Sequence, residues 1–425
     1  MRHSYSLFAL ALVACNSRPP ATSDTASAAA TAAATIPCAA DNAGLVLPDS
    51  FCAVLVGDSL GEVRQLVVAP SGAVYAARRN EAGNGVVALM DREGDGTYET
   101  RDEFGAFGGN DVEIHDNHLY YALPDRIVRW PLPAGATDPA GALAPQGEPE
   151  VVVAGLPADD GHVAKSMAFL GDTMIVNVGS HTNSCQVADR ENRSPGNDPC
   201  TELERRAGLW AFDATTANQQ YRPEARWATG LRNTMALAVH PATGGLLFAV
   251  HGRDQLHQNW GYSEEVSAEN PAEEFGVVQQ GDDFGWPYCY YSNRRGGRVT
   301  APEYGGDGEK ADRCDGFAQP LLMFPGHWAP MALIVHSGNM FGADYEGGVF
   351  LAFHGSWNRA PLPQAGFRVV FIPFANGRPS GEYQTFATAT SGPTGLRAAG
   401  VAEGPDGSLY LTDDRRGAIW RVMRR

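Results

Sequence analysis

One histidine of the sequence stands where a general base could act. His162 follows Asp159, Asp160 and Gly161 and leads into an alternating apolar stretch. A nearby carboxylate stabilises the imidazolium that forms when a histidine accepts a proton, so we predict that His162 is a general base. A loop histidine that only bonds the backbone is the alternative.

Arginines occupy matching positions before other apolar stretches. Arg232 and Asn233 precede one stretch, and Arg397 precedes another. Guanidinium groups pair with carboxylates through parallel hydrogen bonds, so arginines that converge from several loops would form a pocket for a carboxylate-bearing ligand. A purely structural role at the loop ends is the alternative for each arginine.

Two segments could supply oxygen ligands to a hard cation such as calcium. The irregular segment from His251 to Asp254 offers backbone carbonyls. Asp91 to Gly96 has acidic residues at alternate positions, like the start of a calcium loop, but Asp102 stands where that loop needs a glutamate. We therefore interpret Asp91 to Gly96 as a hairpin turn.

Six stretches that share one pattern would have to position these residues. Each stretch has an alternating strand, a turn rich in Gly, Asp or Asn, and a second apolar strand. They are residues 64–75, 110–121, 165–178, 233–250, 331–353 and 399–411. Radial repetition of such units leaves few exposed sheet edges, so we predict an all-β, six-bladed β-propeller over residues 38–425. Two packed β-sandwich domains are the alternative.

One connection is longer than the others and poor in alternation. Residues 253–330 therefore predict a large loop insertion between blades. Insertions in repeat folds usually gather on the binding face, so we expect this segment near the site.

The start of the chain predicts a targeting segment. Residues 1–15 carry Arg2 and a short apolar run that ends at Cys15, and this run is too short to span a bilayer. The segment is similar to a lipoprotein signal peptide, with Cys15 as the lipidated residue; an ordinary signal peptide is the alternative. Residues 16–37, rich in Ala, Thr and Ser, predict a flexible tether. We expect an exported protein, periplasmic or at the cell surface, that meets the membrane only through this lipid anchor.

The remaining cysteines agree with export, because their number is even. They form three sequence-local pairs, and we expect disulfides within each: Cys38 with Cys52, Cys185 with Cys200, and Cys289 with Cys314. No cysteine or histidine spacing typical of zinc occurs. The formal net charge of −17 argues against a nucleic-acid partner, which needs a positive face.

Several motifs occur together and in one order along residues 47–425. They are Arg64-Gln65-Leu66, Gly161-His162, Gly230-Leu231-Arg232-Asn233, Phe284-Gly285-Trp286-Pro287-Tyr288, His354-Gly355-Ser356-Trp357-Asn358-Arg359 and Pro405 to Asp414. In these motifs the sequence resembles the glucose/sorbosone dehydrogenase family, the soluble sugar dehydrogenases that carry pyrroloquinoline quinone on a six-bladed propeller. It is most similar to the L-sorbosone dehydrogenase branch.

The resemblance implies roles for the candidate residues. His162 would remove the proton of a sugar hydroxyl while hydride passes to the quinone. Arg232 and Asn233 would contact the quinone, and the backbone oxygens of Gly252 and Arg253 would bind calcium.

Further cationic contacts to the quinone would come from Arg397, Arg359 and Lys165. The sequence departs from the family pattern at Lys165, where relatives commonly have arginine, and at Ala399, where the glucose-oxidising branch has a second arginine. Lysine keeps the charge but loses the planar fork of arginine.

The expected activity is the oxidation of an aldose or sugar-like alcohol or aldehyde with pyrroloquinoline quinone and calcium, followed by electron transfer to an unidentified acceptor. A non-catalytic cell-surface propeller that binds a glycan or protein is one alternative. A calcium-dependent lactonase is another, but it would need central carboxylates as metal ligands.

Overall fold

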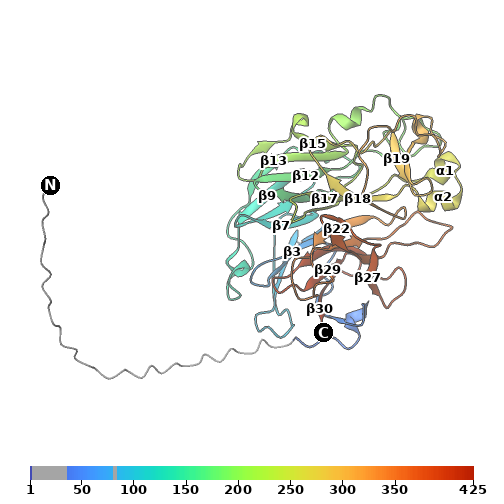
Figure 1. The fold of residues 1–425 in the computed structure, drawn as a ribbon. Helices are drawn as coiled ribbons and strands as arrows, with labels where there is room; N and C mark the ends of the chain where they lie inside the picture. Colours follow the sequence, from blue (N-terminus) through green and yellow to red (C-terminus); the bar gives the residue numbers. More distant parts are fainter. Residues whose placement is uncertain (2–35, 80–83) are drawn as a thin grey trace, which may run out of the picture. The chain divides into compact units, whose positions relative to one another are not determined.

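Each of the six repeated stretches contributes the first two strands, paired antiparallel, of one sheet in a computed structural model of the chain (Figure 1). The structure describes residue 1 and residues 36–79 and 84–425. The predicted signal peptide beyond Met1, Cys15 and the predicted tether up to residue 35 lie outside the described residues. None of the helices described is long and apolar enough to cross a membrane.

The first three blades follow one another along the chain. Blade 1 consists of β3 (Val63–Val68), β4 (Val74–Arg78), β5 (Val86–Met90) and β6 (Thr100–Phe104). Blade 2 consists of β7 (Asp111–His115), β8 (His118–Ala122), β9 (Arg126–Pro131), β10 (Glu150–Ala154) and the short β14 (Gln219–Gln220). Blade 3 consists of β11 (Met167–Leu170), β12 (Thr173–Val178), β13 (Gly208–Asp213) and β15 (Arg226–Thr229).

The other three blades complete the ring. Blade 4 consists of β16 (Ala236–Val239), β17 (Leu246–Val250), β18 (Glu273–Val278) and β21 (Leu322–Phe324). Blade 5 consists of β22 (Pro330–Val335), β23 (Val349–Phe353), β24 (Arg368–Ile372), β27 (Gln384–Ala389) and β1 (Leu45–Val46). Blade 6 consists of β28 (Ala398–Glu403), β29 (Leu409–Asp413), β30 (Ala418–Arg424) and β2 (Phe51–Gly57). The predicted six-bladed propeller is confirmed.

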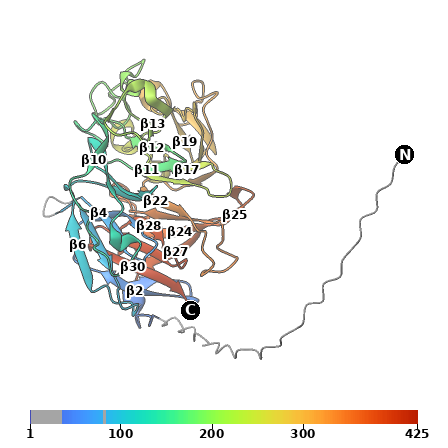
Figure 2. The ribbon, with the colours of Figure 1, turned by 90° about the vertical axis from the view of Figure 1, so that its left-hand side faces the viewer.

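Blade 6 joins the two ends of the propeller. Its outer strand β2 comes from the start of the described chain and pairs with β30 at the other end, with Ala53 opposite Val422 (Figure 2). This pairing covers the edge that β30 would otherwise expose, and it closes the ring without an extra element.

The innermost strands surround a common axis, and a glutamine side chain links several of them. Each of β3, β7, β11, β16, β22 and β28 contacts the next. The Nε2 atom of Gln65 in β3 donates to the Met235 carbonyl at 2.8 Å and the Met331 carbonyl at 2.6 Å, and lies 3.2 Å from Ser166 Oγ. Gln65 is buried. One amide therefore ties blade 1 to blades 3, 4 and 5.

The middle strands are mainly apolar because both faces of each sheet are covered. All residues of β4, β5 and β23 are buried. Neighbouring sheets share core clusters, such as the one in which Tyr75 of blade 1 packs with Trp130 of blade 2. Burial of apolar area at roughly 25 cal/mol per Å² is the main force that holds the blades together.

Residues 253–330 differ from the predicted single loop insertion, because the segment includes two strands of blade 4. β18 pairs with β17 on one side and with β21 on the other. The sequence did not predict β18 because the strand begins with two charged residues, Glu273 and Glu274. Both are buried, and their carboxylates accept hydrogen bonds from the Gly252 N–H and from Arg298.

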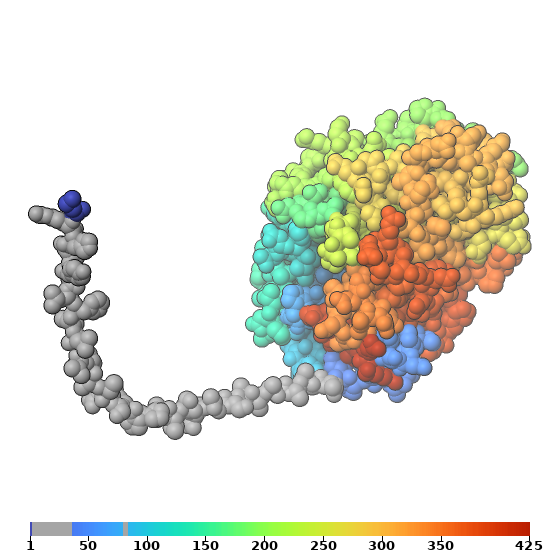
Figure 3. All heavy atoms as spheres, viewed as in Figure 1, coloured from blue at the N-terminus to red at the C-terminus, as the bar shows by residue number. Residues whose placement is uncertain are grey.

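Two excursions remain outside the blade. The first carries the short helices α1 (Leu256–Trp260) and α2 (Glu264–Glu269), and the second carries a hairpin of β19 (Cys289–Ser292) and β20 (Gly297–Thr300). Figure 1 places α1, α2 and β19 close together, and the yellow to orange surface of Figure 3 marks the same region.

Small elements complete the chain. A two-stranded pair of β25 (Phe374–Ala375) and β26 (Arg378–Pro379) lies between β24 and β27. The 3-10 helices are η1 (Asn42–Gly44), η2 (Ala134–Ala136), η3 (Thr201–Glu204), η4 (Pro223–Ala225) and η5 (Pro302–Tyr304).

The three expected disulfides are confirmed: Cys38–Cys52, Cys185–Cys200 and Cys289–Cys314. The Asp91 to Gly96 segment is the turn between β5 and β6, as interpreted from the sequence. The Asp91 carboxylate accepts hydrogen bonds from the backbone N–H groups of Gly94 and Gly96, both at 2.7 Å.

Candidate functional site

Three of the predicted site residues line one cavity of about 160 Å³: His162, Arg232 and Gly252. His162 precedes β11 and Arg232 precedes β16, so the loops that lead into two inner strands deliver both side chains. Gly252 follows β17 in the loop on the same side of blade 4. The cavity therefore lies at the end of the propeller where the inner strands begin.

The ring of His162 is held in one tautomer. Its backbone N–H donates to the Ser180 carbonyl at 2.9 Å, and its Nδ1 lies 2.9 Å from the same carbonyl and 3.0 Å from Ser180 Oγ. A carbonyl oxygen only accepts hydrogen bonds, so Nδ1 must carry the hydrogen. The lone pair of the neutral ring then resides on Nε2, which has no protein hydrogen-bond partner among the described residues.

Burial, with the nearby Arg232 guanidinium, lowers the pKa of His162 to about 3. The imidazole is therefore neutral at ordinary pH and can accept a proton at Nε2. Asp254 acts in the opposite direction on this pKa and stabilises the imidazolium once it forms.

Arg232 is buried and fixed by groups from two loops. Its Nε and Nη2 donate to the carbonyl and Oδ1 of Asn183, both at 3.1 Å, and its Nη1 donates to the Gly252 carbonyl at 2.8 Å. Nη2 also lies 3.1 Å from Asp254 Oδ2. The guanidinium plane thus has a defined orientation at the cavity wall.

Asp254 is the centre of the charge arrangement in the cavity. Its carboxylate pairs with Arg232 and Arg190, lies 3.5 Å from the His327 ring, and accepts from Asn358 Nδ2 at 2.7 Å. Burial alone would raise the pKa of Asp254, but Arg232 and His327 outweigh burial and hold it well below the ordinary value. The pKa of His327 is raised, because the contact with Asp254 outweighs its own burial.

Several oxygen atoms also line the cavity. Glu273 is buried, and its carboxylate accepts from the N–H groups of Gly252 at 2.9 Å and Ala329 at 3.3 Å. Burial raises the pKa of Glu273 to about 7. Asn358 Oδ1 is a buried acceptor that has no hydrogen-bond partner among the residues that the structure describes. With the Gly252 carbonyl, these groups form an oxygen-rich donor set that suits a hard cation. Within the described residues no group of three or more His, Cys, Asp and Glu side chains could hold a metal.

Asn233 and Arg253 lie beside the cavity residues but face other partners. Asn233 Oδ1 lies 3.4 Å from Asn177 Nδ2. The Arg253 guanidinium turns away to a buried ion pair with Glu303 at 2.6 Å. A role of Arg253 in cation binding would therefore have to come from its backbone.

Lys165 is not brought to the cavity. Its side chain is fully buried, and Nζ donates to the carbonyls of Pro157 at 3.0 Å and Val163 at 2.6 Å. Burial, with a contribution from Arg206, lowers the pKa of Lys165 to about 7. These contacts tie Lys165 to the loop that carries His162, and a cofactor contact by Lys165 stays a prediction that would require side-chain movement.

This burial predicts a pH-dependent stability term. Between pH 7 and 10 Lys165 keeps its proton in the unfolded chain and tends to lose it in the folded chain. The contribution of Lys165 to the free energy of unfolding therefore rises with pH. We expect the free energy of unfolding of the wild type, minus that of Lys165→Met, to rise by about 1 kcal/mol per pH unit from 7.5 to 9.5. Urea unfolding at each pH measures it. Lys310→Met, at the exposed second lysine, is the control; equal pH dependence in both variants would contradict the assignment.

Arg359 and Arg397 also lie outside the cavity lining. Arg359 donates to the Gly326 carbonyl at 3.1 Å and pairs with Glu269 at 2.5 Å, so it fixes α2. Arg397 contacts the ring of His354, with Nη2 2.6 Å from Nδ1, and His354 lies 2.7 Å from Asp414. Cofactor contacts by either arginine remain predictions that would require side-chain movement.

The sequence alone did not identify several cavity residues: Asp254, Glu273, His327, Asn358, Arg190 and, behind Arg232, Asn183. Asp254 and Asn358 stand in the quoted motifs, so their signal was present without an assigned role. His327 lies in the loop that leads into β22, a position that matches those of His162 and Arg232, whereas Arg190 lies in the long connection between β12 and β13.

A larger cavity, of about 510 Å³, lies at the other end of the inner strands. It is lined mainly by apolar residues of β11, β16 and β22, together with Glu113 and Glu403. It lacks the convergent histidine and arginine groups, so we assign the functional site to the smaller cavity.

Comparison with known proteins gives a family. The sequence model of the TrAA12-like family matches residues 45–425. A pyrroloquinoline quinone-dependent pyranose dehydrogenase from Coprinopsis cinerea is 27% identical over 234 residues, covering 46% of this chain and 31% of the relative. An uncharacterized protein from Borreliella burgdorferi is 28% identical over 211 residues, covering 48% of this chain and 50% of that protein. The matches thus span half or less of these curated relatives.

Solved structures share the fold over most of the chain. An enzyme of Carbohydrate-Active Enzymes family AA12 from Trichoderma reesei has a TM-score of 0.72 at 18% identity, covering 90% of this chain and 98% of the other. The holo pyrroloquinoline quinone domain of the pyranose dehydrogenase from Coprinopsis cinerea has a TM-score of 0.70 at 17% identity, covering 89% and 97%. A similarity at this identity establishes the propeller architecture.

Proposed function

The chain belongs to the TrAA12-like family, and we propose that it is a pyrroloquinoline quinone-dependent dehydrogenase that oxidises an aldose or a sugar-like alcohol or aldehyde. The observation that carries the proposal is the convergence, in one cavity, of the free Nε2 of His162 with the Arg232 guanidinium and several oxygen donors. The names of the relatives agree with it, since the pyranose dehydrogenase from Coprinopsis cinerea uses this quinone.

The residues present suit the cofactor. Pyrroloquinoline quinone bears carboxylates, which the guanidinium groups of Arg232 and Arg190 could pair. Calcium would find the Gly252 carbonyl, the Glu273 carboxylate and the unpartnered Asn358 Oδ1 in the same cavity. The cavity of about 160 Å³ is smaller than the roughly 300 Å³ of typical ligand sites, so it would enclose only part of the cofactor. Trp357 lines this mouth and is 67% exposed.

His162 would accept the hydroxyl proton of the substrate at Nε2. The Ser180 carbonyl keeps Nδ1 protonated, so the ring presents its lone pair to the cavity throughout. When bound, the quinone would supply the hydride acceptor that no amino-acid side chain can provide. Asp254 would stabilise the imidazolium formed at His162, and Asp254 is itself kept ionised by Arg232 and His327.

Sugar-dependent dye reduction tests the proposal. The purified chain is incubated with pyrroloquinoline quinone and calcium, and an artificial electron acceptor is followed with a panel of aldoses. We expect reduction that saturates with sugar and disappears when the quinone is omitted. A folded chain that gives no quinone-dependent reduction with any sugar would argue for the non-catalytic propeller.

A calcium-dependent lactonase is the second candidate, because Asp254 and Glu273 place two carboxylates in the cavity. A metal bound there could polarise an ester carbonyl, with His162 as the base for water. This activity needs calcium but no quinone, so lactone hydrolysis measured with calcium alone separates the two candidates.

We also propose that the protein is exported and that Cys15 carries a lipid. The three disulfides suit an oxidising compartment. An external acceptor would then take electrons from the reduced cofactor. Mass spectrometry of the membrane fraction would reveal a lipid on Cys15.

A further inference from the structure

The loop of residues 180–185 supports both the histidine and the arginine of the site. The Ser180 carbonyl accepts from the backbone N–H and from Nδ1 of His162. Three residues later, the carbonyl and Oδ1 of Asn183 accept from Arg232. A displacement of this loop would therefore change the position of both groups.

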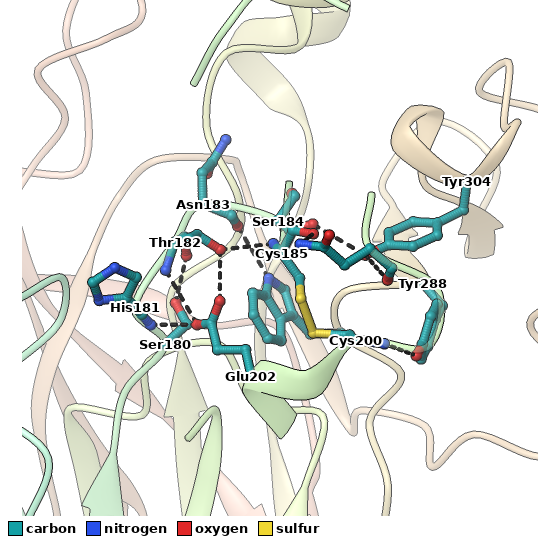
Figure 4. Close-up of a disulfide and its surroundings, with 12 residues drawn as sticks. Ser180, His181, Thr182, Asn183, Ser184, Cys185, Cys200, Glu202, Tyr288 and Tyr304 are labelled. Carbon is teal, nitrogen blue, oxygen red and sulfur yellow. Dashed lines mark hydrogen bonds between the residues drawn. A yellow bond between two sulfur atoms is a disulfide. The ribbon is translucent and has the colours of Figure 1, made fainter. Parts of the chain in front are cut away.

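A carboxylate outside the cavity anchors this loop. Glu202 Oε1 accepts from the backbone N–H of His181 and, at 3.1 Å, from that of Thr182. Its Oε2 accepts from Thr182 Oγ1 at 2.7 Å. Figure 4 shows the Glu202 side chain reaching from η3 toward the backbone of His181 and Thr182. One carboxylate thus satisfies three donors of two consecutive residues.

The anchor continues to His162 through one further residue. The Ser180 hydroxyl donates to the Thr182 carbonyl at 2.7 Å, and Ser180 Oγ lies 3.0 Å from His162 Nδ1. Because the Ser180 hydrogen is committed to Thr182, its oxygen presents lone pairs to Nδ1. The orientation of Thr182 therefore sets the acceptors that hold the ring.

A hydrogen bond and a disulfide hold the loop of residues 180–185 next to helix η3. Thr182 Oγ1 accepts from the Cys185 N–H at 2.7 Å, and Cys185 is bonded to Cys200 beside η3. Glu202 itself lines a separate cavity of about 380 Å³ with Arg205 and Arg206, and it does not line the cavity of His162. Its effect on the site must pass through the loop.

We propose that Glu202 is a positioning residue for the general base: through Thr182 and Ser180 it fixes the ring of His162 with Nδ1 protonated and Nε2 directed into the cavity. This inference rests on the proposed function for its kinetic consequence. Its structural consequence, the tautomer of His162, exists in the chain without cofactor and can be measured separately.

Glu202→Gln keeps the shape of the side chain and removes the charge that strengthens the three hydrogen bonds. We expect kcat to fall about 10-fold to 100-fold, as for a slightly misplaced catalytic group. The dissociation constant of the quinone should change less than kcat does, because Arg232 can lose only its Asn183 contacts and keeps those with Gly252 and Asp254. Glu202→Asp, which keeps the charge, should retain more of kcat than Glu202→Gln.

Glu204→Gln is the matched control, since Glu204 lies exposed on the same helix η3. Thr182→Val removes the hydroxyl between Glu202 and Cys185. If the two residues act through one contact, the double variant Glu202→Gln/Thr182→Val should be no slower than the slower single variant. Fully multiplicative losses would contradict a shared path.

Nitrogen NMR of the apo chain labelled at histidine decides the structural part without any turnover. The His162 signals are assigned by their absence in His162→Gln. We expect the Nδ1–H tautomer in the wild type and a mixture of tautomers in Glu202→Gln. An unchanged tautomer together with unchanged kcat would overturn the inference. A wild type without turnover would contradict the proposed function, and the tautomer comparison would still decide the role of Glu202.

Discussion

His162→Ala is expected to lower kcat by about 10²-fold to 10⁴-fold, which is the usual contribution of a positioned general base. The loss has a direct physical reason, because the Ser180 carbonyl holds the hydrogen of the neutral His162 ring on Nδ1 and leaves the lone pair of Nε2 free to accept a proton. Binding of the quinone should change little, since His162 provides no cation for its carboxylates. Stopped-flow reduction of the bound quinone by sugar measures the effect.

His118→Ala is the control for this experiment, because the His118 ring lies at a blade 2 hairpin, beside the Asp116 carbonyl and Tyr120, and does not line the cavity. Its kcat should equal that of the wild type. Unchanged turnover in His162→Ala would eliminate the proposed base, whatever the control shows.

Arg232→Ala should weaken quinone binding by about 10²-fold or more, since truncating one partner of a buried charge pair costs about 2–5 kcal/mol. The substitution removes the guanidinium from Asn183, Gly252 and Asp254 together. Asp254 would retain Arg190 and His327 as partners. Fluorescence titration with the quinone in saturating calcium measures the dissociation constant.

Two further variants keep this prediction open to contradiction. Arg232→Lys keeps the charge but loses the planar fork, so its binding should lie between that of the wild type and Arg232→Ala. Arg126→Ala, at a surface arginine paired with Asp125, should bind as the wild type does. Wild-type affinity in a folded Arg232→Ala variant would exclude this arginine from the cofactor site.

The sequence predicted the propeller because each blade repeats the same local physics. An alternating inner strand, a tight turn and a mainly apolar second strand recur six times, and every copy packs between two similar neighbours. The pattern did not predict strand β18, because this strand begins with the two charged residues Glu273 and Glu274. Buried carboxylates with specific partners look like a solvated loop in the sequence.

The predicted site residues that line the cavity lie in loops that lead into the blades or directly after β17. His162, Arg232 and Gly252 met in one cavity for that reason. Lys165 follows His162 by three residues, yet its side chain turns to the carbonyls of Pro157 and Val163. Side-chain direction at the start of a strand depends on backbone geometry that residue types do not reveal.

Residues from the irregular connections could not be placed by repetition. Asp254 lies just before the helical excursion of blade 4, Arg190 lies in the long connection between β12 and β13, and Glu202 lies on a short helix next to a disulfide. Their roles arise from contacts between segments far apart in the sequence, such as Asn358 with Asp254. The propeller brings such segments to one end of the axis, and only the folded structure shows which of them meet.

Calorimetric titration of the purified apo chain with pyrroloquinoline quinone, with calcium and again with a calcium chelator, shows whether the cavity binds this cofactor. We predict saturable binding at one site per chain in calcium and much weaker binding without it, because Gly252, Glu273 and Asn358 would hold the cation beside Arg232. A folded chain that binds no quinone in calcium would contradict the account and leave a propeller whose cavity serves another ligand.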